Sequence, residues 1–113
     1  NICDEIIKLI KDRKNYNYTC GCKLNNLMQE LSPKDNDFKI ALEKVYFNFE
    51  AIFEKVLDNA VKIGEIKTTD TKALGMFVVA SIEGCLGTAK KSQDGAYFLT
   101  CISQLELFFK SLK

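Results

Sequence analysis

The chain has 113 residues, 47% of them hydrophobic and 27% charged, and its 16 basic and 15 acidic side chains give a net charge of +1. This length favours a single domain with one core, and the abundance of Leu, Ile, Val and Phe argues against intrinsic disorder. The balanced charge argues against direct binding of nucleic acid, whose partners usually present a basic face. No apolar run approaches the roughly 20 residues that span a membrane, so we expect no membrane partner.

The absence of histidine excludes several kinds of site. A Ser-His-Asp triad, a Cys-His pair and an imidazole base all need that side chain, as do zinc sites built on histidine. The five cysteines are an odd number, and the one close pair, Cys20 and Cys22, has the spacing C-x-C rather than the C-x-x-C of zinc and redox motifs. We therefore expect no catalytic residue, no metal and no cofactor. We expect a cytoplasmic protein whose reduced thiols pack mostly as small hydrophobes.

One alternative stays open for Cys20 and Cys22. They lie at the predicted N-terminus of a helix, where the helix dipole favours a thiolate, so a sensor of oxidants or electrophiles is conceivable. Only Lys23 lies nearby in the sequence to support such activation. The simpler interpretation is that both thiols pack at the start of the helix.

Apolar residues recur at the 3.6-residue spacing of amphipathic helices along nearly the whole chain, and the alternating pattern of strands is absent. The intervening segments are short and rich in Asn, Asp, Gly and Ser, which are typical of turns. The pattern predicts five helices, over Ile2–Arg13, Cys20–Leu31, Phe38–Ile63, Thr71–Lys91 and Ala96–Leu112.

The ends of these helices carry recognisable signals. Pro33 ends the second helix, because the residue before a proline is disfavoured in the helical region. Asn36 or Asp37 is the expected N-cap of the long third helix, and Gly64 is placed to form its left-handed C-cap. Asp70 is the expected N-cap of the fourth helix.

The last two predicted helices are apolar over more of their circumference than packing within one small bundle requires. Surplus apolar surface commonly marks a protein interface, and small residues in the fourth helix allow another helix to approach closely. We therefore predict an all-α antiparallel bundle that forms a symmetric homodimer, with the last two helices of each chain building a four-helix bundle. The predicted dimer interface consists of Ala80, Gly84, Gly87, Ile102, Leu105 and Phe109.

Several short motifs resemble one known family. The segment from Gly21 to Ser32 has the pattern G-C-x-x-x-N-L-x-x-E-L-S, and a capped turn and a long amphipathic helix that ends at Gly64-Glu65-Ile66 follow it. Asp70, Ala73 and Gly84 continue the series. From Cys20 to the end, the chain therefore resembles the C-terminal half of the tetracycline-repressor (TetR) family of bacterial transcription regulators.

The resemblance implies a single ligand-sensing and dimerisation domain over residues 1–113, and no enzyme. In that family an N-terminal helix-turn-helix domain binds operator DNA. No such motif precedes Ile2, so we expect operator binding only through a missing N-terminal domain. A small apolar or aromatic effector in the bundle would alter that binding.

Aromatic residues are concentrated in the long third helix, where they could wall a pocket between helices, a usual site for small molecules. Ordinary core packing is the alternative for each of them. Where the family's long helix commonly carries tryptophan, this sequence has Phe and Tyr. The candidate effector-binding residues, taken from the inward stripes of the second to fourth helices, are Leu24, Met28, Tyr46, Phe49, Phe53, Phe77 and Ile82.

A stand-alone helical module that pairs with another protein, without sensing a small molecule, is the alternative function. It predicts a filled core, whereas a regulator's effector domain predicts a homodimer that binds an apolar compound. An enzyme is the weakest of the three hypotheses, because no serine in the sequence has a base nearby and no carboxylate or thiolate site is evident.

Overall fold

The computed structural model describes residues 1–12 and 33–113. Within these ranges the chain forms helices and no strand, which confirms the all-α prediction. The predicted helix over Cys20–Leu31 lies outside the described residues, so a total of five helices stays a prediction. The helices observed are α1 (Ile2–Lys11), α3 (Asn36–Lys62), α4 (Thr71–Ser92) and α5 (Gly95–Ser111).

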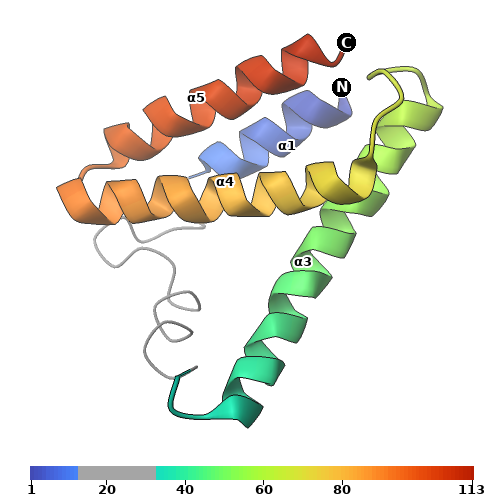
Figure 1. Cartoon of the computed structure of the whole chain (residues 1–113). Coiled ribbons are helices and arrows are strands. Elements are labelled where there is room, and N and C mark those ends of the chain that lie inside the picture. Colours follow the sequence, from blue (N-terminus) through green and yellow to red (C-terminus); the bar gives the residue numbers. More distant parts are fainter. Residues whose placement is uncertain (13–32) are drawn as a thin grey trace.

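Figure 1 shows α4 and α5 running antiparallel beside each other, α1 beside α5, and α3 crossing α4 obliquely. The N-terminal half of α3 extends away from the other helices. Both chain ends lie near the loop that joins α3 to α4. Two hydrogen bonds fix that arrangement: the backbone N–H of Ile2 donates to Oε1 of Glu65 at 2.6 Å, and the N–H of Lys67 donates to the carbonyl oxygen of Leu112 at 2.6 Å.

The capping signals at α4 and at the end of α3 are confirmed. The Asp70 carboxylate accepts a hydrogen bond from the N–H of Ala73 at 3.1 Å. Gly64 has a φ of +75°, and the N–H of Glu65 reaches the carbonyl oxygen of Ala60 at 3.0 Å, which is the bond that closes a Schellman motif. Ile66 beyond it is buried. Helix α3 begins at Asn36, two residues before the predicted start, so Asn36 and Asp37 lie within the helix and the prediction that one of them is its N-cap was wrong.

The core lies where α1, α4 and α5 meet the C-terminal half of α3. Burial of each large aliphatic or aromatic side chain contributes about 1.5–3 kcal/mol before the loss of conformational entropy is counted. The side chains with no exposed surface come from three helices, and they are Leu57, Ala60, Val78, Ala89, Phe98 and Ile102.

Helix α4 is central to this core, because it packs against α3 and also against α5. It is long and apolar enough, by length and composition alone, to cross a membrane. Contact with two helices explains part of this apolar character, since Leu74, Val78 and Leu86 are all buried. The remainder lies on a surface described below.

The backbones of α3 and α4 come closest at Gly75. A Cβ atom placed on this glycine would lie 2.8 Å from the carbonyl oxygen of Glu50 and 3.1 Å from the backbone nitrogen of Glu54. Both neighbours are backbone atoms, so they cannot move aside as a flexible side chain would. Near the start of α4, the buried hydroxyl of Thr71 donates a hydrogen bond to the carboxylate of Asp58 on α3.

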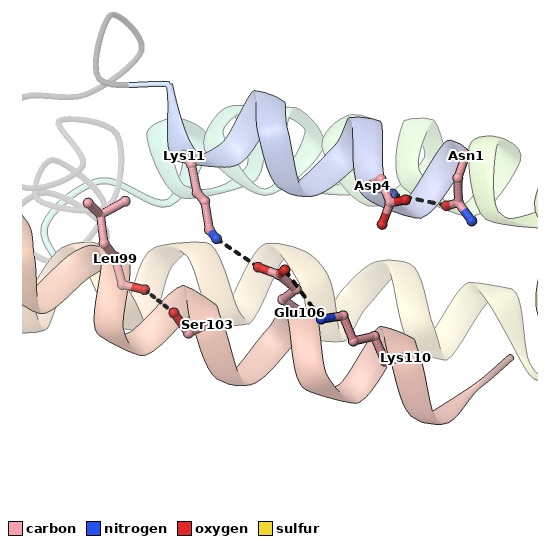
Figure 2. A network of polar contacts seen from close by, with 7 residues as sticks. All are labelled: Asn1, Asp4, Lys11, Leu99, Ser103, Glu106 and Lys110. Atoms are coloured by element: carbon pink, nitrogen blue, oxygen red, sulfur yellow. Dashed lines mark hydrogen bonds and ion pairs between the residues drawn. The ribbon is translucent and has the colours of Figure 1, made fainter.

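Helix α1 is tied to α5 by a polar contact at the edge of the core (Figure 2). The Lys11 ammonium lies 2.7 Å from Oε2 of Glu106, and the Lys110 ammonium lies 3.7 Å from Oε1 of the same carboxylate. The hydrogen bond from Lys11, followed by the charges of both lysines, lowers the pKa of Glu106. Because the Glu106 side chain is still 32% exposed, solvent weakens this pairing.

We expect Gly75→Ala to destabilise the chain by about 1–3 kcal/mol, since the added methyl group forces the α3 and α4 backbones apart. Gly84→Ala is the matched control in the same helix, because a Cβ there meets nothing within 4 Å. The control should gain up to about 1 kcal/mol from improved helix propensity. Chemical denaturation measures both, and a Gly75→Ala variant as stable as Gly84→Ala would contradict the close helix crossing.

We also expect the Lys11–Glu106 pair to make stability depend on pH. A carboxylate with a lowered folded-state pKa stabilises the protein above its ordinary value of 4.5, and this contribution is lost as the pH falls through the lowered value. Glu106→Gln should therefore cost about 0.2–1 kcal/mol at pH 7 and low salt, with the difference vanishing in acid. In the Lys11→Met background the same substitution should cost less, and an equal cost in both backgrounds would show that the pair is not coupled.

Candidate functional site

The residues predicted to bind an effector divide into separate groups. Leu24 and Met28 lie outside the described residues. Tyr46, Phe49 and Phe53 follow one stripe of α3: Tyr46 and Phe53 are half-buried, and Phe49 is 45% exposed. Two of the predicted residues, Phe53 and Ile82, are packed against the core.

Phe77 of α4 lies apart from the other predicted effector-binding residues. Its ring packs against the ring of Phe108 on α5, with the centroids 5.2 Å apart and an interplanar angle of 62°, an edge-to-face arrangement. Its side chain is 47% exposed. Phe77 therefore belongs to the outer surface formed by α4 and α5 rather than to the stripe of α3.

This outer surface, which we call the α4–α5 face, consists of exposed residues at helical spacing on the two helices. On α4 the residues are small apart from one aromatic ring, and on α5 they are larger. None of them is charged, which is typical of the centre of a protein interface. The face comprises Phe77, Ala80, Gly84, Gly87 and Thr88 from α4, and Tyr97, Gln104 and Phe108 from α5.

The predicted dimer residues fall on both sides of α4 and α5. Ala80, Gly84 and Gly87 are exposed on the α4–α5 face. Ile102, Leu105 and Phe109 are instead core residues of the single chain, with 0%, 4% and 2% of their surface exposed, which contradicts the prediction that they are exposed to a partner. The reason is that α5 is apolar on opposite sides, and periodicity alone does not say which side faces inward. Of the three, Leu105 also lines the groove described next.

A groove of about 350 Å³ opens on the α4–α5 face. Gly84 provides room for it, because no side chain stands at that position. Polar groups from Ser81, Thr88 and Gln104 line it together with the apolar Phe77 and Leu105, and so do two cysteines, Cys85 and Cys101.

Cys85 and Cys101 are joined by a disulfide, with their Cα atoms 5.5 Å apart. The expectation of reduced thiols throughout the chain is therefore corrected for this pair. The two cysteines are equidistant in sequence from Gln93, the left-handed residue at which α4 ends, so an antiparallel pairing of α4 with α5 brings them level with each other. The equal spacing of the two cysteines from the turn is visible in the sequence. Short motifs such as C-x-x-C do not detect it, because they compare only cysteines that are close in sequence.

Among the described cysteines, Cys3 is free and buried in the core. Burial raises the pKa of the Cys3 thiol, and the nearby carboxylate of Glu65 raises it further. This thiol is therefore protonated at neutral pH and poorly reactive. Cys20 and Cys22, the pair for which a sensing role was left open, lie outside the described residues.

A second groove, of about 560 Å³, lies between α1 and α5 around the Lys11–Glu106 pair. Its lining mixes both signs of charge, so it does not select an anion or a cation. The described residues also bring no three His, Cys, Asp or Glu side chains together in a way that could hold a metal ion. The groove is lined by Asp4, Ile7, Lys8, Lys11, Asp12 and Glu106.

Comparison with known proteins identifies the family. The family model described as "Transcriptional regulator LmrA/YxaF-like, C-terminal domain" matches residues 2–104. Searches of the curated proteins and of the solved structures found no match. Because the matched region takes in nearly the whole chain, the resemblance to tetracycline repressors is confirmed, and the chain belongs to the LmrA/YxaF-like C-terminal domains of TetR-family transcription regulators.

Proposed function

We propose that this chain is the ligand-sensing and dimerisation domain of a cytoplasmic TetR-type regulator. The observation that carries the proposal is the α4–α5 face, an uncharged and largely apolar surface on the two helices that were predicted to form the dimer. Membership of a family of transcription regulators supports it. No catalytic function is proposed.

The chemistry of the α4–α5 face fits a second copy of the same chain. The exposed rings of Phe77 and Phe108 supply apolar area, and the small residues Ala80, Gly84 and Gly87 let a facing helix approach closely. A two-fold axis through this face would place the same residues of both chains against each other. Such packing removes surface from water that a single chain leaves exposed.

The effector site that we propose lies along the stripe of α3 that carries Tyr46, Phe49 and Phe53, together with Ile82 of α4, which like Phe53 packs against the core. These residues combine half-buried rings with an exposed one, so they offer both a rigid wall and free apolar surface. Leu24 and Met28, which lie outside the described residues, stay predicted members of this lining. A small apolar or aromatic compound is the effector that suits such a lining.

Regulation would follow from linkage between the effector and the packing of the dimer. A ligand shifts a conformational equilibrium only by its difference in affinity for the two states. In the complete regulator, two N-terminal DNA-binding domains would have to reach half-sites roughly 34–36 Å apart. A change in the dimer that alters this separation would weaken operator binding.

To test the dimer, we predict the effect of Gly84→Arg. A Cβ atom at this position would meet nothing within 4 Å in the single chain, the residue is exposed, and arginine is a better helix former than glycine, so folding should be retained. The wild type should sediment as a dimer at about 10 μM, and the variant should dissociate at least about 100-fold more readily.

The matched control for the dimer is Asn59→Arg, which adds the same charge at an exposed position of α3. This variant should remain dimeric. A wild-type chain that stays monomeric at every concentration tested would contradict the dimer, as would equal dissociation of both variants.

To test effector binding, we predict that planar apolar or aromatic compounds raise the thermal midpoint of the wild type. A ligand present at 100 times its dissociation constant stabilises the folded state by about 2.7 kcal/mol. Phe49→Ala should weaken binding about tenfold, which corresponds to about 1.4 kcal/mol.

Phe47→Ala is the control, since this ring is exposed on a different side of the same helix. It should leave the binding constant unchanged. A broad panel of such compounds that produces no stabilisation, or an equal loss in both variants, would contradict the proposed site.

A further inference from the structure

The groove on the α4–α5 face gives access to a disulfide. Cys85 and Cys101 both line this groove of about 350 Å³, and they come from different helices. Cys85 is almost fully buried, at 3% exposed, while Cys101 is half-buried. Cys101 is therefore the more exposed residue of the pair to a small molecule that enters the groove.

The surroundings of this bond differ from those of the free thiol. Cys3 lies in the core, where burial raises its pKa and keeps it unreactive. Cys85 belongs to the same core cluster, but its partner Cys101 is only half-buried, and both cysteines line the groove together with Ser81 and Thr88. Among the described cysteines, exchange with a small thiol should therefore be confined to this pair.

A disulfide in a cytoplasmic regulator is unusual and calls for an explanation. Thiols are kept reduced in the cytoplasm, and disulfides there are usually transient and used in catalysis or redox sensing. A buried bond shielded from small thiols could serve as a permanent brace, whereas a bond at the base of an open groove is exposed to exchange.

We propose that Cys85 and Cys101 form a reversible thiol–disulfide site whose reaction partner is a low-molecular-weight thiol. The thiolate of the small molecule attacks Sγ of Cys101, which forms a mixed disulfide, breaks the Cys85–Cys101 bond and releases Cys85 as a thiolate that takes up a proton. A second small thiol then attacks the mixed disulfide and frees Cys101. The two small thiols are oxidised to one disulfide, and the protein gains their two electrons and two protons.

Reduction would loosen the attachment of α4 to α5. The bond closes a loop across a sequence separation of 16 residues that includes the turn at Gln93. Its loss restores conformational freedom to the unfolded chain. It also leaves the relative position of the two helices to packing alone.

The effect on assembly rests on the proposed function. A second chain seated on the α4–α5 face would cover the groove and shield the disulfide. Exchange would then proceed through the dissociated chain, and the dimer and the redox state would be linked.

The first experiment incubates the folded chain in mixtures of reduced and oxidised glutathione, starting once from the oxidised and once from the reduced protein. After acid quenching and alkylation, digestion at lysine yields Cys85 and Cys101 in separate peptides, 73–90 and 92–110, unless the disulfide joins them. At each glutathione ratio, both starting states should reach the same fraction of disulfide-linked peptide. Across the ratios, this fraction should change from nearly complete in oxidised glutathione to nearly none in reduced glutathione. A pair that stays linked at every ratio, or open at every ratio, would overturn the proposal.

The second experiment measures the thermal midpoint with and without reductant. The wild type should lose about 5–15 °C on reduction, as expected for a cross-link over a loop of this length. Cys3→Ala, the control, should retain this shift, whereas Cys101→Ala should show none. A shift of wild-type size in Cys101→Ala would assign the redox response to other cysteines and overturn the proposal.

The rate of reduction separates the thiol site from the dimer. If the dimer covers the groove, the rate constant should fall with rising protein concentration in the wild type and stay constant in Gly84→Arg. A reversible pair whose rate is independent of concentration supports the thiol site and contradicts a dimer across this face. An irreversible pair in a chain that still dimerises would overturn the thiol site alone.

Discussion

Helix α4 packs on α3 along one side and on α5 along another, and the remaining helices are positioned through these two contacts. The first depends on Gly75, where the α3 backbone is too close to admit a methyl group. The second depends on the buried rings and aliphatic side chains of α5, with Phe98 and Ile102 fully enclosed. Because both contacts draw on apolar side chains of one helix, α4 must be apolar over most of its circumference.

The third side of α4 connects this packing to function. A helix enclosed by two neighbours still leaves Phe77 and a row of small residues exposed, and α5 adds Phe108 beside them. In a family of transcription regulators, such a surface suits pairing of two identical chains. The groove and the Cys85–Cys101 bond lie within the same surface, so helix pairing and the proposed chain pairing and thiol exchange all involve one region.

Local signals allowed the start of α4 and the end of α3 to be predicted, because caps depend on only a few residues, whereas the start of α3 differed by two residues. Asp70 and Gly64 act as expected, since a carboxylate satisfies free N–H groups and only glycine adopts a positive φ without strain. The side of α5 that faces the core could not be predicted, because Ile102 and Phe108 are similarly apolar and only tertiary packing distinguishes them. The disulfide was missed for a related reason: it depends on which helices pair.

The chain ends of this domain meet at one place. The first backbone N–H of α1 is held by the Glu65 carboxylate, and Lys67, two residues later, holds the carbonyl oxygen of Leu112 at the end of α5. The short loop between α3 and α4 therefore touches the start of the first helix and the end of the last. A pull or a twist applied to Asn1 would therefore reach the α3–α4 loop directly through the Glu65 carboxylate, in addition to the core contacts of Ile2 and Cys3.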